Sequence, residues 1–207
     1  MARINTIEHI LFDVWKEDIY LAGRRNPILK YKAVVGKDTN NSIRVFSIVS
    51  DSYQLLTNED ALRMGKELHL KLFPNASSDS FEVFNVITPS TKSFCHIDII
   101  DKNYTLNLMK SEVYVPFVRI HNSYNKSRSL KFDIGFVRRL CNNGVIFEEK
   151  AVSLKFAHTK QALSLKGLEN INVKHLKKYE DDFVSKLNIS AGSVSYTHLT
   201  LPTKLEV

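Results

Sequence analysis

Short runs of β-branched and aromatic residues recur along this chain, and they constrain its fold more than any other feature of the sequence. Runs of this length and composition are typical of β-strands, and the short polar segments between neighbouring runs are typical of turns. Because consecutive strands joined by short turns pair antiparallel, the pattern predicts a largely antiparallel sheet. The runs occupy residues 31–36, 44–50, 81–87, 94–100, 113–121, 130–137 and 152–159.

Two other segments have apolar residues at helical spacing. Residues 57–74 begin with Thr57 and Asn58, either of which can cap the first turn, and the segment ends at Pro74. One face of this segment is apolar: Ala61, Leu62, Gly65, Leu68 and Leu72. Residues 172–187 have a similar face: Leu176, Tyr179, Phe183, Val184 and Leu187. The sequence therefore predicts an α+β protein that has a largely antiparallel sheet and two main helices.

The chain is expected to fold as one domain over residues 1–192, since 207 residues with 43% apolar and 25% charged content are typical of a protein with a single core. Its last stretch differs in character from the rest. Residues 194–199 match one reading frame of a transposon-end adapter used in sequencing libraries (GTC TCT TAT ACA CAT CT). We therefore interpret residues 193–207 as a non-native tail, and we expect the natural protein to continue beyond Gly192.

A cytoplasmic location without a membrane partner is expected. No segment approaches the roughly 20 consecutive apolar residues of a membrane span. The apolar run near the N-terminus is interrupted by Asp13, Lys16 and Glu17, which disfavours a signal peptide. Two cysteines, Cys95 and Cys141, are too few for a secreted disulfide framework.

The excess of positive charge lies in the second part of the chain. Residues 1–118 hold 14 Lys/Arg and 14 Asp/Glu, whereas residues 119–190 hold 14 Lys/Arg and 7 Asp/Glu. A one-sided basic field attracts polyanions such as nucleic acid or acidic partner surfaces. The same charge can also serve only to keep the protein soluble, so both interpretations stay open.

The strands predicted at 113–121 and 130–137 form a hairpin with a polar, basic connection. Arg119 and His121 share one strand face, and Lys131 and Asp133 share a face on the next strand. Tyr124 is a candidate for stacking on unpaired bases, the alternative being a tyrosine that only decorates the tip of a loop. Phosphate contacts are predicted for six cations: Arg119, Lys126, Arg128, Lys131, Arg138 and Arg139.

Common catalytic and cofactor motifs are absent from the sequence. It contains no glycine-rich phosphate loop and no zinc-binding spacing, so no cofactor and no metal site is predicted. Weak candidates for catalysis are Asn122, Cys141 and His158, because a cysteine close to a histidine can act as a nucleophile with its base. Together with His121, the cysteine and the histidine could instead ligate zinc. The simpler alternative is that these residues are structural, since free cysteine is often buried.

Several short elements follow one another in an order that is similar to that of a known family. They are Tyr53 with Asn58, Asn122 with Ser123, the segment 138–143, and His158 with Thr159. Over residues 31–159 this order resembles the phage- and plasmid-encoded family called domain of unknown function 932. The resemblance implies a cytoplasmic accessory protein of a mobile genetic element, without an established activity and with its C-terminal part missing.

Three functions are open from the sequence. The first is a non-enzymatic nucleic-acid-binding module that contacts phosphates through a basic face after residue 118. The second is an enzyme with a Cys/His/Asn site. The third is a protein-interaction module that binds a host protein, and the sequence leaves the oligomeric state undecided.

Overall fold

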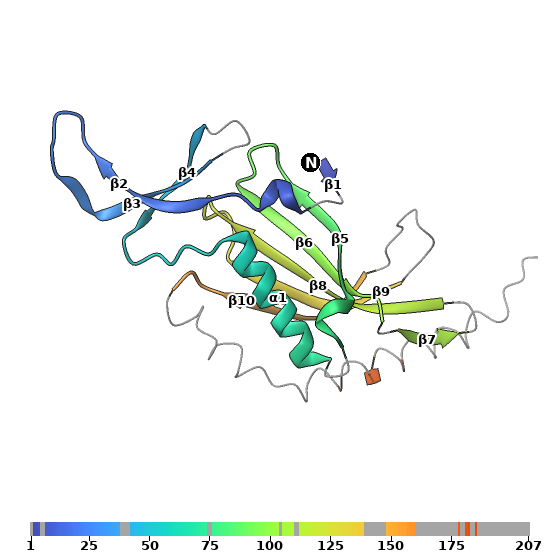
Figure 1. The fold of residues 1–207 in the computed structure, drawn as a ribbon. Coiled ribbons are helices and arrows are strands. Elements are labelled where there is room, and N and C mark those ends of the chain that lie inside the picture. The colour runs from blue at the N-terminus through green and yellow to red at the C-terminus, as the bar shows by residue number, and fades with distance from the viewer. Residues whose placement is uncertain are drawn as a thin grey trace, which may run out of the picture.

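The computed structural model describes residues 2–4, 7–37, 42–73, 76–103, 105–109, 112–138 and 148–159, together with four isolated positions between 178 and 185. The described residues form ten strands, one α-helix, α1 (Asn58–Leu72), and the short 3-10 helices η1 (Glu8–Ile10) and η2 (Ser78–Ser80) (Figure 1). The strands are β1 (Ala2–Ile4), β2 (Val14–Tyr20), β3 (Pro27–Lys37), β4 (Ile43–Ser50), β5 (Phe81–Thr88), β6 (Phe94–Asp101), β7 (Leu106–Met109), β8 (Glu112–Ser123), β9 (Leu130–Arg138) and β10 (Glu148–Phe156).

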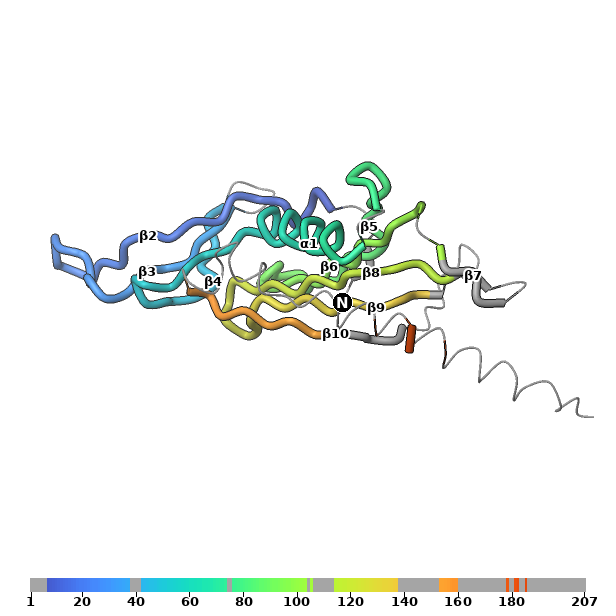
Figure 2. Tube along the Cα trace, turned by 90° about the horizontal axis from the view of Figure 1, so that it is seen from below, coloured from blue at the N-terminus to red at the C-terminus, as the bar shows by residue number. Residues whose placement is uncertain are grey.

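The strands make two antiparallel sheets. Sheet A has the order β1-β5-β6-β8-β9-β10, with β7 paired to β8, and sheet B has the order β2-β3-β4. Figures 1 and 2 show sheet B as an arm that extends from one end of sheet A, while α1 lies over one face of sheet A. Each of the seven predicted strands overlaps an observed one, so the prediction of a largely antiparallel arrangement is confirmed.

The predicted α+β class with two main helices is wrong, because the described residues form mostly antiparallel β-sheet with one α-helix. The second predicted helix, 172–187, lies outside the described residues apart from the four isolated positions, which are helical. The predicted tail, 193–207, lies outside them too.

Sheet B contains one strand that was not predicted, β2, which pairs with β3. Charged residues interrupt the apolar pattern of β2 in the sequence, and two of them, Lys16 and Asp18, contact other segments in the fold. Asp18 forms an ion pair with Lys32 on β3, and Lys16 Nζ donates to the carbonyl of Asp51 (2.9 Å).

Helix α1 begins and packs as the sequence predicts. Of the two possible caps, Thr57 is the one used, because its Oγ1 accepts a hydrogen bond from the backbone N–H of Asp60 (3.0 Å). The helix ends at Leu72, where the backbone N–H of Phe73 still donates to the carbonyl of His69 (2.9 Å). The predicted apolar stripe faces sheet A, which fixes the helix on that face.

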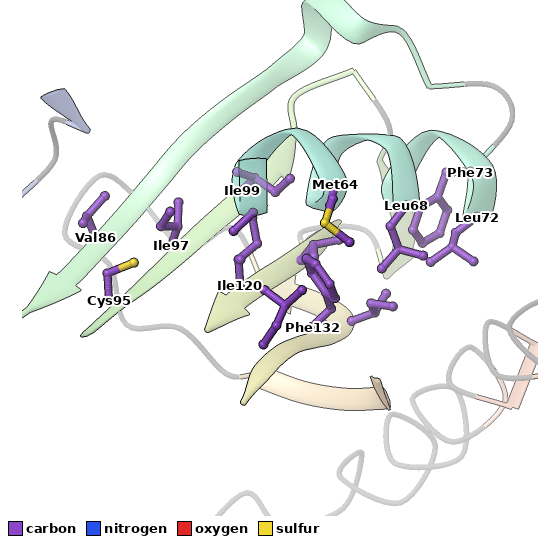
Figure 3. Close-up of a cluster of buried hydrophobic side chains, with 14 of the residues drawn as sticks. Met64, Leu68, Leu72, Phe73, Val86, Cys95, Ile97, Ile99, Ile120 and Phe132 are labelled. Atoms are coloured by element: carbon purple, nitrogen blue, oxygen red, sulfur yellow. The ribbon is translucent and has the colours of Figure 1, made fainter. Parts of the chain in front are cut away.

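The main hydrophobic core lies between α1 and sheet A (Figure 3). Burial of each large aliphatic or aromatic side chain there contributes about 1.5–3 kcal/mol to stability. The opposite face of sheet A, which α1 does not cover, carries charged residues such as Asp98 and Arg119. The labelled core residues in Figure 3 are Met64, Leu68, Leu72, Phe73, Val86, Cys95, Ile97, Ile99, Ile120 and Phe132.

Gly65 marks the closest approach of α1 to the sheet. A methyl group added at this position would lie 2.5 Å from Cδ1 and 2.9 Å from Cγ1 of Ile120, and Ile120 is itself fully buried. On an open helix surface, alanine in place of glycine would stabilise by about 1 kcal/mol. Here the clash costs about 1–3 kcal/mol. We therefore expect Gly65→Ala to lower the free energy of unfolding by about 1 kcal/mol, measured by urea denaturation; a stabilised variant would show that the helix is not held this close.

Candidate nucleic-acid interface

Three segments that are distant in the sequence meet at the end of sheet A next to sheet B. They are strand β4, the turn 89–93 between β5 and β6, and the turn 124–129 between β8 and β9. Hydrogen bonds join all three, so their relative positions are set by the fold. These bonds run from the Tyr124 backbone N–H to the Ser93 carbonyl (2.8 Å), from Ser47 Oγ to the Tyr124 carbonyl (2.7 Å) and from Arg44 Nη1 to the Thr91 carbonyl (3.0 Å).

Four cations on these segments form what we call the basic end: Arg44, Lys92, Lys126 and Arg128. The three segments contain no Asp or Glu. Among the residues that the structure describes, no carboxylate lies within ion-pair distance of any of the four cations. All but Lys92, which is half-buried, are exposed, so this end of the molecule presents uncompensated positive charge.

The turn 124–129 is held in place by its own polar side chains. Ser123 Oγ donates to the carbonyl of Arg128 (2.7 Å) and accepts from the backbone N–H of the same residue (3.1 Å). Asn125 Oδ1 accepts from the backbone N–H of Ser127 (3.1 Å). The turn therefore places Lys126 at its tip, where a φ of 59° puts the residue in the left-handed region.

Arg128 connects the basic end to the far face of sheet A, the face opposite α1. Its guanidinium carbon lies 4.9 Å above the centre of the Phe94 ring, and its Nη1 donates to Nε2 of His96 (2.9 Å). Burial first, and then the neighbouring His121 and Arg128, lowers the pKa of His96 to about 4. His96 is therefore neutral at pH 7 and accepts the hydrogen bond from Arg128.

Arg119 lies on this far face and is paired with a buried carboxylate. Its Nε and Nη2 donate to the two oxygens of Asp98 (2.6 and 2.9 Å), and the amide of Asn85 donates to the same carboxylate (3.1 Å). Asp98 is 3% exposed. A bidentate pair of this kind holds the guanidinium firmly, so the charge of Arg119 is compensated within the fold.

A second buried carboxylate, Asp133, compensates Lys131. It accepts hydrogen bonds from Lys131 Nζ (2.8 Å), from His121 Nε2 (2.8 Å) and from Ser153 Oγ (2.7 Å). The strand register places Arg119 opposite Asp133 and His121 opposite Lys131, so the predicted common face of these four residues is confirmed. Burial lowers the pKa of His121, and the nearby Asp133 only partly offsets this effect.

The structure places Tyr124 in the core, so its ring presents no face to a base. The side chain is 1% exposed and packs against Phe12 and Phe46, with ring centres 5.9 and 5.3 Å away. Its hydroxyl accepts a hydrogen bond from the backbone N–H of Asn58 at the start of α1 (2.9 Å). Tyr124 therefore anchors the basic turn to the helix.

Asn122, a weak candidate for catalysis, belongs to a buried amide network on the α1 side of sheet A. Its Nδ2 donates to Asn58 Oδ1 (2.9 Å) and to the carbonyl of Leu56 (3.1 Å). Asn58 Nδ2 donates in turn to the carbonyl of Ile10 (2.9 Å), and Cys95 Sγ donates to Asn58 Oδ1 (3.2 Å). Burial raises the pKa of the Cys95 thiol to about 12, which leaves it unreactive. The network joins η1, the start of α1 and sheet A.

His158, the second of these candidates, is half-buried against the loop that follows β4. Its ring stacks on Tyr53 with centres 4.9 Å apart, and its Nδ1 lies 3.2 Å from the carbonyl oxygen of Gln54. Burial lowers its pKa. The Tyr53–His158 and Asn58–Asn122 contacts thus join members of three of the short elements on which the family resemblance is based. The third candidate, Cys141, lies outside the described residues, as do Arg139 and the side chain of Arg138.

Two members of the basic end, Arg44 and Lys92, were missed in the sequence. Both lie in the first 118 residues, where basic and acidic residues balance, and they are 48 positions apart in the chain (92 − 44). No local motif marks them, because only the packing of β4 and of the turn 89–93 against the turn 124–129 brings them beside Lys126 and Arg128.

No family model, no curated protein and no solved structure matches this chain. The resemblance to domain of unknown function 932 therefore stays a prediction. In the described part of the chain, no helix has the length and apolar character needed to cross a membrane. Within the same residues, no three His, Cys, Asp or Glu side chains are grouped so that they could hold a metal ion.

Proposed function

We propose that this chain is a non-enzymatic nucleic-acid-binding protein and that it contacts phosphates through the basic end. The observation that carries the proposal is the convergence of Arg44, Lys92, Lys126 and Arg128, without a described carboxylate beside them, on three segments that hydrogen bonds hold together. Exposed cations on turns are common phosphate contacts, and they bind without reading sequence. As the family resemblance implies, the protein serves as a cytoplasmic accessory protein of a phage or plasmid.

This proposal narrows the six predicted cations to those whose charge is available. The charges of Arg119 and Lys131 are compensated by Asp98 and Asp133. We therefore expect these two cations to stabilise the sheet and not to contact phosphate. Lys126 and Arg128 remain as contacts. Arg138 and Arg139 stay predicted contacts, because the side chain of Arg138 and the whole of Arg139 lie outside the described residues.

Neutralising Lys126 and Arg128 together is expected to weaken binding to single strands and duplexes alike. The affinity of the wild-type protein should fall linearly with salt concentration on logarithmic axes between about 50 and 200 mM. In Lys126→Ala/Arg128→Ala, the magnitude of this slope should fall by about 2, because two phosphate contacts are lost. Fluorescence anisotropy with labelled oligonucleotides measures both quantities.

Arg24→Ala/Arg25→Ala is the matched control, since it removes two exposed cations at the other end of sheet B. Its salt slope should equal that of the wild type, and equal melting temperatures would show that all three proteins are folded. The absence of any nucleic-acid binding at low salt would refute the proposed function. If a host protein then remained bound through the basic end in nuclease-treated lysate, the interaction-module alternative would replace it.

A further inference from the structure

Exposed apolar side chains are concentrated on sheet B and its flanks. Eight large apolar residues of the described chain are exposed, and all of them lie between positions 11 and 48. Three belong to the single strand β4: Ile43 (62% exposed), Val45 (61%) and Ile48 (54%). Contiguous apolar patches are uncommon on monomers and mark interaction surfaces.

The three side chains share one face of sheet B because of a bulge. The register between β3 and β4 shifts from Val34↔Ser47 to Val35↔Val45, which leaves Phe46 as the extra residue. Val34 and Phe46 pack on the other face, in a cluster with Tyr124. Val45 and Ile48 therefore point to the same, uncovered side although they are three residues apart.

Strand β4 is also an open edge. Among the described strands it pairs with β3 alone. Asp51 donates its backbone N–H to the carbonyl of Lys30 on β3, so by the antiparallel alternation the N–H groups of Ser50 and Ile48 point away from β3. Natural edge strands are often protected by charged side chains, proline or bulges; β4 contains one charged residue, Arg44, and one bulge, but no lysine and no proline.

We propose that a second copy of this chain adds to the open edge of β4, so that two β4 strands pair antiparallel about a twofold axis. In the register that opposes Val45 to Ile48 of the second copy, apolar side chains meet across the new ladder on one face. The same register sets Arg44 diagonal to Asp51 of the second copy, so unlike charges are neighbours on the other face. The pairing is self-complementary, and it closes as a dimer with one continuous six-stranded sheet.

A second copy fits this surface better than nucleic acid does. The uncovered face of β4 is aliphatic, whereas protein surfaces that bind single-stranded nucleic acid present cations and aromatic rings. A twofold axis places apolar residues of one β4 opposite apolar residues of the other, and unlike charges beside each other. The strand is therefore complementary to a second copy of itself. The inference does not require nucleic-acid binding, although it places one member of the basic end, Arg44, beside Asp51 of the second copy.

Sedimentation equilibrium of the full chain from about 1 to 100 μM tests the proposal. The wild type should show twice the mass of one chain at the upper end of this range. Val45→Lys/Ile48→Lys should remain monomeric, since it opposes lysines across the axis. Leu29→Lys is the matched control, because Leu29 is 82% exposed on the same arm but lies outside β4, and it should dimerise like the wild type.

Hydrogen exchange separates this interface from any other. The backbone amides of Ile48 and Ser50 should exchange slowly in the dimer and quickly in Val45→Lys/Ile48→Lys, while the melting temperature shows that the variant is folded. A wild type that is monomeric throughout would overturn the proposal. So would a dimer whose Ile48 and Ser50 amides exchange as fast as those of the monomeric variant, or one that Leu29→Lys disrupts equally.

Discussion

Replacing Asn58 with alanine is expected to lower the free energy of unfolding by about 3 kcal/mol. Asn58 is 3% exposed and joins three parts of the fold through its side chain. Without it, the carbonyl of Ile10, the amide of Asn122 and the thiol of Cys95 each lose a hydrogen-bond partner. A buried polar group left without a partner costs about 1–3 kcal/mol, and the amide of Asn122 keeps its bond to Leu56.

Urea denaturation monitored by circular dichroism measures this loss. Asn26→Ala is the matched control, because Asn26 is exposed in the turn between β2 and β3, and it should change stability by less than about 0.5 kcal/mol. A double-mutant cycle of Asn58→Ala with Asn122→Ala should show a coupling of about 1 kcal/mol or more, since the two side chains share a hydrogen bond. If Asn58→Ala were as mild as Asn26→Ala, the network would not hold these elements together.

Acid is expected to destabilise the protein through His69. This imidazole is fully buried in the last turns of α1, with ring centres 4.7 Å from Phe73 and 4.8 Å from Phe81. Neither ring nitrogen has a hydrogen-bond partner among the described residues. Burial, only partly offset by Asp101, lowers the pKa of His69 from 6.5 to about 4.

The stability decreases in acid because the unfolded and folded states protonate His69 at different pH values. The unfolded chain protonates His69 near pH 6.5, whereas the folded protein does so only near pH 4. Above pH 6.5 the imidazole is neutral in both states and the free energy of unfolding is not reduced. As the pH falls from 6.5 towards 4, the unfolded state gains a proton that the folded state does not, and the free energy of unfolding decreases. The loss is at most about 1.4 kcal/mol per pH unit, or about 3 kcal/mol in total.

His69→Leu should remove this sensitivity. At pH 7.5 the variant should be at least as stable as the wild type, because no unpaired ring nitrogens remain. At pH 4.5 it should be more stable by a further 2–3 kcal/mol or so. Other histidines with lowered pKa values, such as His96, occur in both proteins, so their contributions cancel in the difference. Parallel pH profiles of the two proteins would contradict this role of His69.

Local patterns predicted most of the strands because each needs only its own residues. The runs at 94–100 and 130–137 alternate or cluster apolar side chains, and both are strands of sheet A. Strand β2 was not predicted, because Lys16 and Asp18 interrupt its apolar pattern and the residues that they contact lie on distant segments. Sheet B therefore contains one strand that the sequence pattern did not predict.

The candidate interface shows the same limit. The sequence located the excess of positive charge after residue 118, and Lys126 and Arg128 remain exposed cations in the structure. It did not show that Asp98 compensates Arg119, because that contact crosses between β8 and β6. Nor did it show that Asp133, which lies on the same strand as Lys131, is buried and accepts a hydrogen bond from it. Likewise, nothing near Tyr124 in the sequence reveals that its ring is enclosed by Phe12 and Phe46.

By itself, then, the sequence determined seven of the described strands, a helix start at Thr57 or Asn58 and the region of basic charge, since hydrophobic periodicity, capping and net charge are local properties. Only the tertiary structure decided which cations are available. Pairing of a charge depends on which strands become neighbours, and strand order is set by packing over the whole chain. In the fold, Asp98 and Asp133 compensate the charges of Arg119 and Lys131, whereas Arg44 and Lys92 join Lys126 and Arg128 in the basic end.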